Sequence, residues 1–160
     1  MHFIEYNRDK AVNYARRWAF SRNPDYFDFS EIGGDCTNFA SQCLFAGIGV
    51  MNFTKDIGWY YISPANRAAA WSSAEHFKRF MLTNRGEGPF ASAVPINQLE
   101  RGDFICLNNG MECYHTLIVV GIKNTHPLVA AHSRDAFGIP LSSYSYEEAK
   151  GVHILGGNVY

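Results

Sequence analysis

One cysteine of this sequence stands where a thiol could act as a nucleophile. Cys36 follows Gly33, Gly34 and Asp35 in the stretch GGDCTNFASQCLFAG, and the residues after it have the periodicity of a helix. The first turn of a helix stabilises an anion, because its backbone N–H groups are unpaired and the helix dipole is positive there. The thiolate is the reactive form of cysteine, and the same N–H groups can bind the oxyanion formed when a carbonyl is attacked. The pattern indicates a nucleophile, and a buried core cysteine is the alternative.

A nucleophilic thiol needs a base, which in enzymes is most often a histidine. Of the six histidines, His115 begins the apolar run HTLIVVGI and His132 ends the run PLVAAHS. If the two runs pair as a hairpin through KNTHP, both histidines lie at the same end of the sheet. We therefore predict a triad of Cys36, His115 and His132. In this triad His115 is the base, and His132 orients it through a hydrogen bond.

The elements that must position these residues are predicted to be helices first and strands afterwards. Asn7 can cap a helix over residues 7–21, Asp35 can cap a helix that ends near Ala46, and a short helix covers about residues 73–83. Short apolar runs bounded by Gly, Asn and Pro then indicate strands at 102–107, 114–122, 127–133 and 151–155. We predict an α+β fold in which N-terminal helices pack on a C-terminal antiparallel sheet.

Composition and charge limit the class of protein. A chain of 160 residues that is 47% hydrophobic can form one folded domain over residues 1–160 with a core of its own. The net charge of −1, without a block of like charges, argues against a nucleic-acid partner. The sequence predicts neither a signal peptide nor a segment that inserts into a membrane. We expect a chain that is cytoplasmic as it stands or a module of an exported protein.

The four cysteines give no metal-binding or redox motif. Cys36, Cys43, Cys106 and Cys113 form no CxxC pair. A metal site built from Cys36, Cys43, Cys106 and His115 would have spacings that match no familiar site, so we expect neither a metal nor another cofactor. An even number of cysteines permits disulfides, but a domain of this size does not require them. We expect mostly free thiols.

Nearly the whole sequence resembles one family. The segments NPDYFDF, DCTNFASQCLFAG, GWYY, AAAWSSAEHFKRFM, LERGDFICL and HTLIVVGI…PLVAAHS occur here in the order of the putative amidase domain family. That family is similar to the NlpC-type and CHAP-type cysteine peptidases and amidases of bacterial cell walls, a branch of the papain-like fold. The resemblance implies the triad roles for Cys36, His115 and His132. Relatives carry Asn, Gln, Glu or Asp at the third position, and Asn108 and Asn109 are alternative orienting residues here.

Four further residues are candidates for substrate binding. Tyr26 takes the place of a tyrosine whose hydroxyl assists the oxyanion site in NlpC-like peptidases, and Asp35 matches the residue before the cysteine of the family. Trp59 and Trp71 could line a substrate groove. The alternatives are packing in the core for the three aromatic residues and helix capping for Asp35.

The resemblance implies a hydrolase that cleaves amide bonds of peptide-like substrates through a thioester on the cysteine. Peptidoglycan stem peptides and fragments are the leading substrate class. One alternative is a catalytically silent module that binds a cell-wall fragment or a protein. Another is an acyltransferase, in which an amine or an alcohol replaces water. We expect the protein to act as a monomer.

Overall fold

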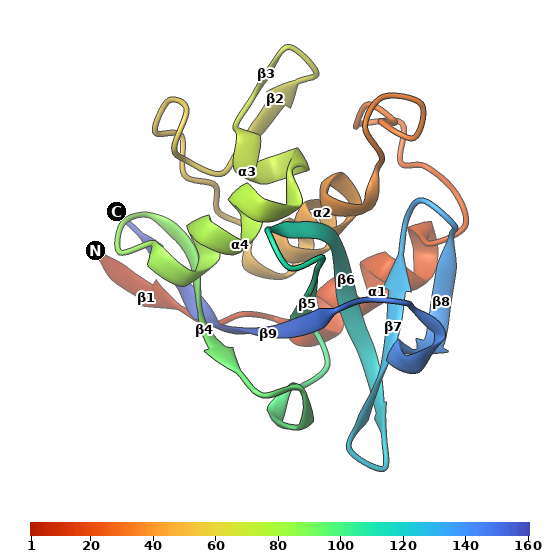
Figure 1. Cartoon of the computed structure of the whole chain (residues 1–160). Helices are drawn as coiled ribbons and strands as arrows, with labels where there is room; N and C mark the ends of the chain where they lie inside the picture. The colour runs from red at the N-terminus through yellow and green to blue at the C-terminus, as the bar shows by residue number, and fades with distance from the viewer.

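The fold places helices against one face of an antiparallel sheet in the computed structural model, which describes residues 1–160. The helices are α1 (Arg8–Trp18), α2 (Cys36–Ile48), α3 (Ala69–Ser72) and α4 (Ala74–Thr83). The sheet contains β1 (His2–Ile4), β4 (Gly88–Val94), β5 (Phe104–Asn108), β6 (Cys113–Lys123), β7 (His126–Ala131), β8 (Ala136–Pro140) and β9 (Glu148–Val159). In Figure 1, α2, α3 and α4 lie above the sheet as drawn. The predicted α+β class is confirmed.

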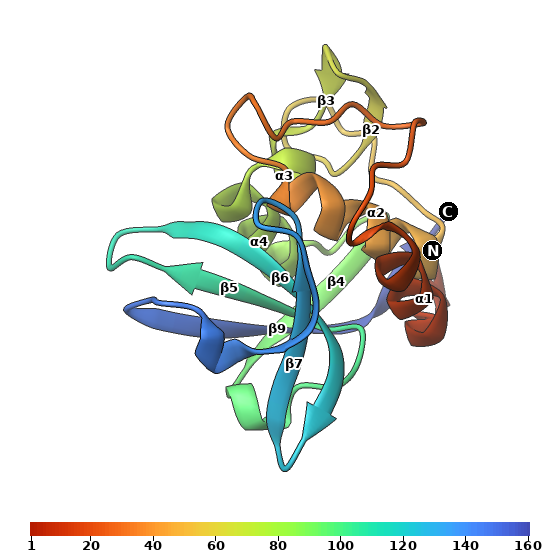
Figure 2. The same ribbon diagram turned by 90° about the vertical axis from the view of Figure 1, so that its right-hand side faces the viewer.

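The sheet is organised around its long last strand. The strand order is β1-β9-β5-β6-β7-β8, and β4 also pairs with β9. Figure 2 shows how β6 and β7 curve away from the rest of the sheet. Three strands of this sheet, β1, β4 and β8, were not predicted from the sequence.

The two main N-terminal helices begin and end largely where the sequence indicates. The side chain of Asn7 caps α1 by accepting a hydrogen bond from the Lys10 N–H at 3.0 Å. Helix α2 ends at Gly49, whose φ of 72° is the left-handed conformation that glycine adopts without strain. Asp35 occupies the N-cap position of α2 but makes no side-chain cap bond, so the predicted capping role is wrong.

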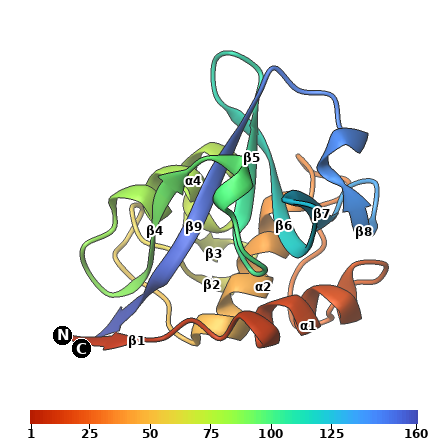
Figure 3. The ribbon, with the colours of Figure 1, turned by 90° about the horizontal axis from the view of Figure 1, so that it is seen from below.

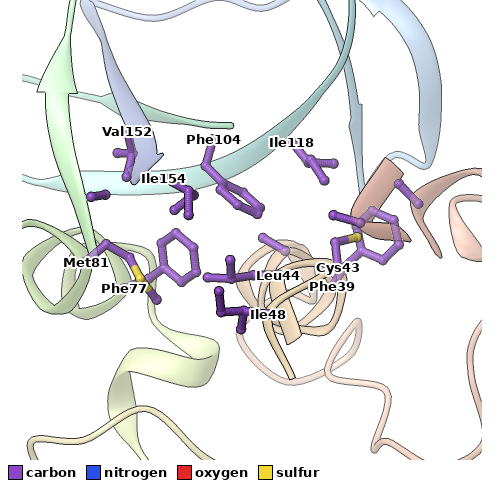
Figure 4. Close-up of a cluster of buried hydrophobic side chains, with 14 of the residues drawn as sticks. Phe39, Cys43, Leu44, Ile48, Phe77, Met81, Phe104, Ile118, Val152 and Ile154 are labelled. Carbon is purple, nitrogen blue, oxygen red and sulfur yellow. The ribbon is translucent and has the colours of Figure 1, made fainter. Parts of the chain in front are cut away.

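The main core lies between the sheet and the helices (Figure 4). Phe104, Ile118, Val152 and Ile154 of the sheet belong to one buried cluster with Phe39 and Leu44 of α2 and Phe77 and Met81 of α4. A second cluster contains Ile105, Leu107, Leu117, Val119 and Val129 of β5–β7, whose positions alternate with those of the first cluster. Side chains alternate between the two faces of a strand, so this part of the sheet is buried on both faces.

The segment between α2 and α4 contains the short hairpin of β2 (Tyr61–Ser63) and β3 (Asn66–Arg67). None of the helices has the length and apolar character needed to cross a bilayer.

A disulfide joins the strands of the β5–β6 hairpin. Cys106 of β5 and Cys113 of β6 are bonded, with their Cα atoms 5.7 Å apart. Cys36 and Cys43 remain free thiols. The expectation of mostly free thiols is therefore wrong for Cys106 and Cys113, because the hairpin brings together two residues seven positions apart.

Candidate active site

Cys36 is the first residue of α2 and is half-buried against β6. The backbone N–H of Thr116 donates a hydrogen bond to its thiol sulfur, and Thr37 Oγ1 lies 3.7 Å from that sulfur. The N–H groups of residues 36–38 donate to no backbone carbonyl. Burial nevertheless outweighs these hydrogen bonds and raises the pKa of the Cys36 thiol above its ordinary value. The thiol is therefore protonated at neutral pH.

The first turn of α2 is fixed to the sheet beside Cys36. The hydroxyl oxygens of Thr37 and Thr116 are 2.9 Å apart, and both residues are buried. This hydrogen bond joins the residue after the cysteine to the strand that carries His115. The nucleophile is thus held against β6 by its neighbours in the sequence.

His115 lies near the start of β6, one residue before the Thr116 N–H that meets Cys36. Burial lowers the pKa of His115 to about 4, so the imidazole is neutral at pH 7. No side chain or backbone group forms a hydrogen bond with its ring nitrogens. The ring centroid of Tyr144 is 5.7 Å from that of His115.

Tyr144 packs beside the imidazole of His115. Burial raises the pKa of the Tyr144 phenol, and the nearby charge of a Cys36 thiolate would raise it further. Cys36 thus lies beside β6, the strand that carries His115, and Tyr144 packs on that histidine.

His132 does not join this group, and its predicted hydrogen bond to His115 is not formed. Its side chain is 2% exposed, and its Nδ1 lies 2.6 Å from Asp35 Oδ2. Its Nε2 is 2.8 Å from the carbonyl oxygen of Trp18 and 3.1 Å from Nη1 of Arg22. The ring stacks on Phe39 at a centroid distance of 3.9 Å. Both nitrogens are therefore engaged away from His115.

The register of the β6–β7 hairpin explains this separation. The hairpin itself was predicted, but its pairing shifts by one residue between Val119 and Gly121. A shift of one residue reverses the set of side chains that share a face. Continued to the end of the hairpin, the shifted register puts His132 opposite Thr116. His115 then points to the other face of the sheet.

The buried carboxylate of Asp35 fixes the loop before the cysteine. Its Oδ1 accepts hydrogen bonds from the Phe29 N–H at 2.8 Å and from Asn38 Nδ2 at 2.9 Å, and its Oδ2 pairs with His132. The backbone N–H of Asp35 donates to Ser133 Oγ at 3.0 Å. Asp35 is fully buried, so the structure contradicts its predicted contact with substrate. Its contacts instead anchor the chain that leads into Cys36.

The predicted aromatic groove is part of the core. Trp59 and Trp71 are both fully buried, with ring centroids 4.8 Å apart. Their indole N–H groups donate to Ser41 Oγ at 3.0 Å and to Asn38 Oδ1 at 2.9 Å. Complete burial leaves neither tryptophan a surface for substrate, so packing is the correct alternative for both.

Tyr26 is half-buried and stacks on Trp71 at 5.9 Å. Burial raises the pKa of Tyr26, so its phenol remains a hydrogen-bond donor at neutral pH. Its hydroxyl forms no hydrogen bond within the chain, and a role at an oxyanion site remains a prediction.

The alternative orienting residues serve the β5–β6 turn instead. Asn108 Oδ1 accepts from the Gly110 N–H at 2.7 Å, and Asn109 Oδ1 accepts from the Met111 N–H at 3.1 Å. Neither reaches His115. The chain thus supplies a thiol at the start of α2 and an imidazole on the adjacent strand β6, without a third polar side chain bonded to the imidazole.

His115 lines an open pocket. We call it the His115 pocket; its volume is about 860 Å³. Its lining residues are Phe20, Leu107, Tyr114, His115, Ser133, Arg134, Asp135, Ala136, Phe137, Ile139, Ser143, Tyr144 and Ser145. Sequence reasoning missed Tyr144 and Arg134. No motif marks them, because only the folding of β8 against β7 brings them to the start of β6.

Comparison with known proteins gives two matches. A family model described as a putative amidase domain matches residues 5–155. The uncharacterized protein YhbB of Bacillus subtilis (strain 168) is 30% identical over 151 residues. The alignment covers 91% of this chain and 46% of YhbB, so the chain spans about half the length of that relative. No solved structure matches the chain.

Proposed function

Because this chain belongs to the putative amidase domain family, we propose that it hydrolyses amide bonds with Cys36 as the nucleophile and His115 as the general base. One observation carries the proposal. Cys36 begins a helix whose first N–H groups lack backbone acceptors, beside the strand on which His115 holds a neutral imidazole with free ring nitrogens. A thiol on a helix N-terminus packed on an antiparallel sheet is typical of papain-like enzymes, and we propose that class for this fold.

The resting site holds a neutral thiol and a neutral imidazole. The pKa of Cys36 is raised and that of His115 is lowered to about 4, so neither group is charged at pH 7. The proton must therefore pass from the thiol to the imidazole as the sulfur attacks the amide carbonyl. A bound substrate would exclude water from around the developing charges and would thereby assist this step.

Backbone N–H groups of the first turn of α2 stabilise the tetrahedral oxyanion. When this intermediate collapses, the carbon–nitrogen bond breaks, the imidazolium of His115 protonates the leaving amine, and a thioester remains on Cys36. Water then attacks the thioester, with His115 accepting its proton, and the acid product leaves the regenerated thiol.

Asp35 and His132 have a positioning role in this mechanism. The buried Asp35–His132 pair, with the Ser133 hydrogen bond to the Asp35 N–H, fixes the turn in which Cys36 sits. In the proposed mechanism, no other side chain takes the orienting role that the sequence predicted for His132. The orientation of His115 instead depends on its packing against Tyr144.

Peptide-like amides are the proposed substrates, with peptidoglycan stem peptides as the leading class. The open His115 pocket is large enough for the side chain of one amino acid next to the scissile bond. Transfer of the acyl group to an amine and binding without turnover are the two alternative outcomes of the same experiment.

The test incubates the chain with purified stem peptides and muropeptides, and mass spectrometry follows the addition of water to a cleaved bond. We expect hydrolysis by the wild type and none by Cys36→Ala. His115→Ala should lower the rate by about 10²- to 10⁴-fold, because it removes the general base. Cys43→Ala is the matched control, since it removes the other free thiol from the core and leaves the site intact.

Three results would count against hydrolysis. Turnover that survives in Cys36→Ala would exclude this cysteine as the nucleophile. A product joined to an added amine in place of the acid would identify an acyltransferase. Equal substrate binding by the wild type and Cys36→Ala, without turnover in either, would identify a binding module.

A further inference from the structure

The His115 pocket contains one charged side chain without a partner. Three of its residues can carry a full charge near neutral pH, namely His115, Arg134 and Asp135. Asp135 is bound by both Nη atoms of Arg22 at 3.0 Å. His115 is neutral, because burial lowers its pKa to about 4. Arg134 is exposed and takes part in no ion pair or hydrogen bond. Arg134 is therefore the one charge of the pocket that is free to pair with a ligand.

The backbone holds Arg134 in place. Ser133 and Arg134 form the turn between β7 and β8 with φ values of 56° and 66°. This left-handed region is unfavourable for residues other than glycine and asparagine. Ser133 Oγ accepts the hydrogen bond from the Asp35 N–H, so the turn is fixed to the residue that precedes Cys36. The backbone from which the Arg134 side chain extends is thus held next to the loop that leads into Cys36.

Part of the wall around this charge is apolar. Phe20 is 68% exposed, and Phe137 and Ile139 of β8 line the same pocket. The Arg134 guanidinium also acts on Tyr144, the residue that packs on His115, since its charge lowers the pKa of that phenol against the larger effect of burial. An arginine fork binds carboxylates preferentially, and the apolar walls favour a hydrocarbon side chain.

We propose that Arg134 selects substrates by binding a free carboxylate on a residue whose apolar side chain fills the His115 pocket. The substrate class is thus an amide of a carboxylate-bearing apolar amino acid, such as the C-terminal residue of a peptide. This inference rests on the proposed function, since it places the carboxylate next to the bond that Cys36 attacks.

The test uses two alkylating probes that differ only in charge, N-bromoacetyl-leucine and N-bromoacetyl-leucinamide. In each reaction the Cys36 sulfur forms a bond to the methylene carbon, bromide leaves and the thiol proton passes to base. Mass spectrometry of the intact protein and of its peptides gives the rate at Cys36. Each rate is divided by the rate of the same probe with glutathione, which removes the intrinsic difference between the probes.

We expect the acid to react with wild-type Cys36 about tenfold faster than the amide after this correction. Arg134→Gln should reduce the preference to about onefold, while Arg134→Lys keeps the charge and should retain part of it. Arg85→Gln is the matched control, because Arg85 is an exposed arginine that lines a different pocket. It should leave the preference unchanged. An unchanged preference in Arg134→Gln, or no preference in the wild type, would overturn the inference.

The two proposals can fail separately. If the chain hydrolyses amides but reacts equally with both probes, only the carboxylate inference is wrong. If the acid probe is preferred through Arg134 and no amide is cleaved, the carboxylate site stands and the proposed hydrolysis fails.

Discussion

His115 is a histidine that its surroundings keep neutral. Its pKa is lowered to about 4 by burial, and no carboxylate opposes that effect. Thiol hydrolases can start from a thiolate–imidazolium pair, but the electrostatics here favour the two neutral groups. The charge separation is then deferred until a carbonyl is present to accept the electrons of the sulfur.

This shift has a consequence for stability at acid pH. The folded pKa of His115 is about 4 and the ordinary value is 6.5, so the unfolded chain binds the proton first as the pH falls. The stabilising contribution of neutral His115 to the unfolding free energy is complete above pH 6.5, and it is lost as the pH falls toward 4. Between pH 7.5 and 5 the wild type should lose about 2 kcal/mol more unfolding free energy than His115→Gln. Urea unfolding of both proteins at the two pH values measures the difference, and parallel losses would contradict the shift.

Residue by residue, the sequence indicates the nucleophile better than its partners. Cys36 could be recognised because glycines, an aspartate and a helical pattern surround it. The position of His132 could not be predicted, since one extra residue near Val120 decides on which face of the sheet its side chain lies. Whether Trp59 and Trp71 line a groove or a core depends on contacts with α2. Those contacts leave no local pattern in an aromatic-rich segment.

At the scale of elements, the β5–β6 hairpin is the part that carries His115, and its disulfide closes the loop two residues before that histidine. A cross-link over so short a loop removes conformational freedom mainly from the unfolded chain.

Reduction of this disulfide should lower the unfolding free energy by about 2.5 kcal/mol. Thermal unfolding with and without dithiothreitol measures the effect. The double variant Cys106→Ala/Cys113→Ala should resemble the reduced wild type and should not respond to the reductant. Cys43→Ala should respond as the wild type does. A wild type with four titratable thiols in denaturant before reduction would show that the disulfide does not form.

The elements that could be predicted are those with a periodic apolar pattern, namely α1, α2, α4, β5, β6, β7 and β9. The strands β1, β4 and β8 could not. β1 has three residues, β4 is rich in small residues, and β8 contains Gly138. They are strands because β9 and β7 present free edges for pairing. Such a partner is not visible in a local stretch of sequence.

For the whole molecule, one buried carboxylate connects the helical layer with two strands. Asp103, the residue before β5, is fully buried and binds Arg8 of α1 at 2.7 Å. It also accepts hydrogen bonds from His153 Nδ1 at 2.8 Å and from the Ile154 N–H at 2.9 Å, both in β9. These contacts join residues that are far apart in the sequence, and no local pattern predicts them.

Asp103→Asn should lower the unfolding free energy by about 3 kcal/mol, because it leaves Arg8 without its counter-charge. Asp9→Asn is the matched control. Asp9 pairs with Arg101 at the surface, where its side chain is 78% exposed, and the loss should be at most about 0.5 kcal/mol. Urea unfolding at pH 7 compares them. Similar losses in the two variants would show that Asp103 does not hold the layers together.

The two ends of the chain lie side by side, since His2 pairs with Val159 at the edge of the sheet (Figure 3). A short linker could therefore join residue 160 to residue 1, and the ring could be reopened at the exposed Asn124–Thr125 turn. Such a circular permutant would keep each strand next to its present neighbours. The fold thus depends on which strands meet at β9, and the opening between residues 160 and 1 could be exchanged for one at an exposed turn.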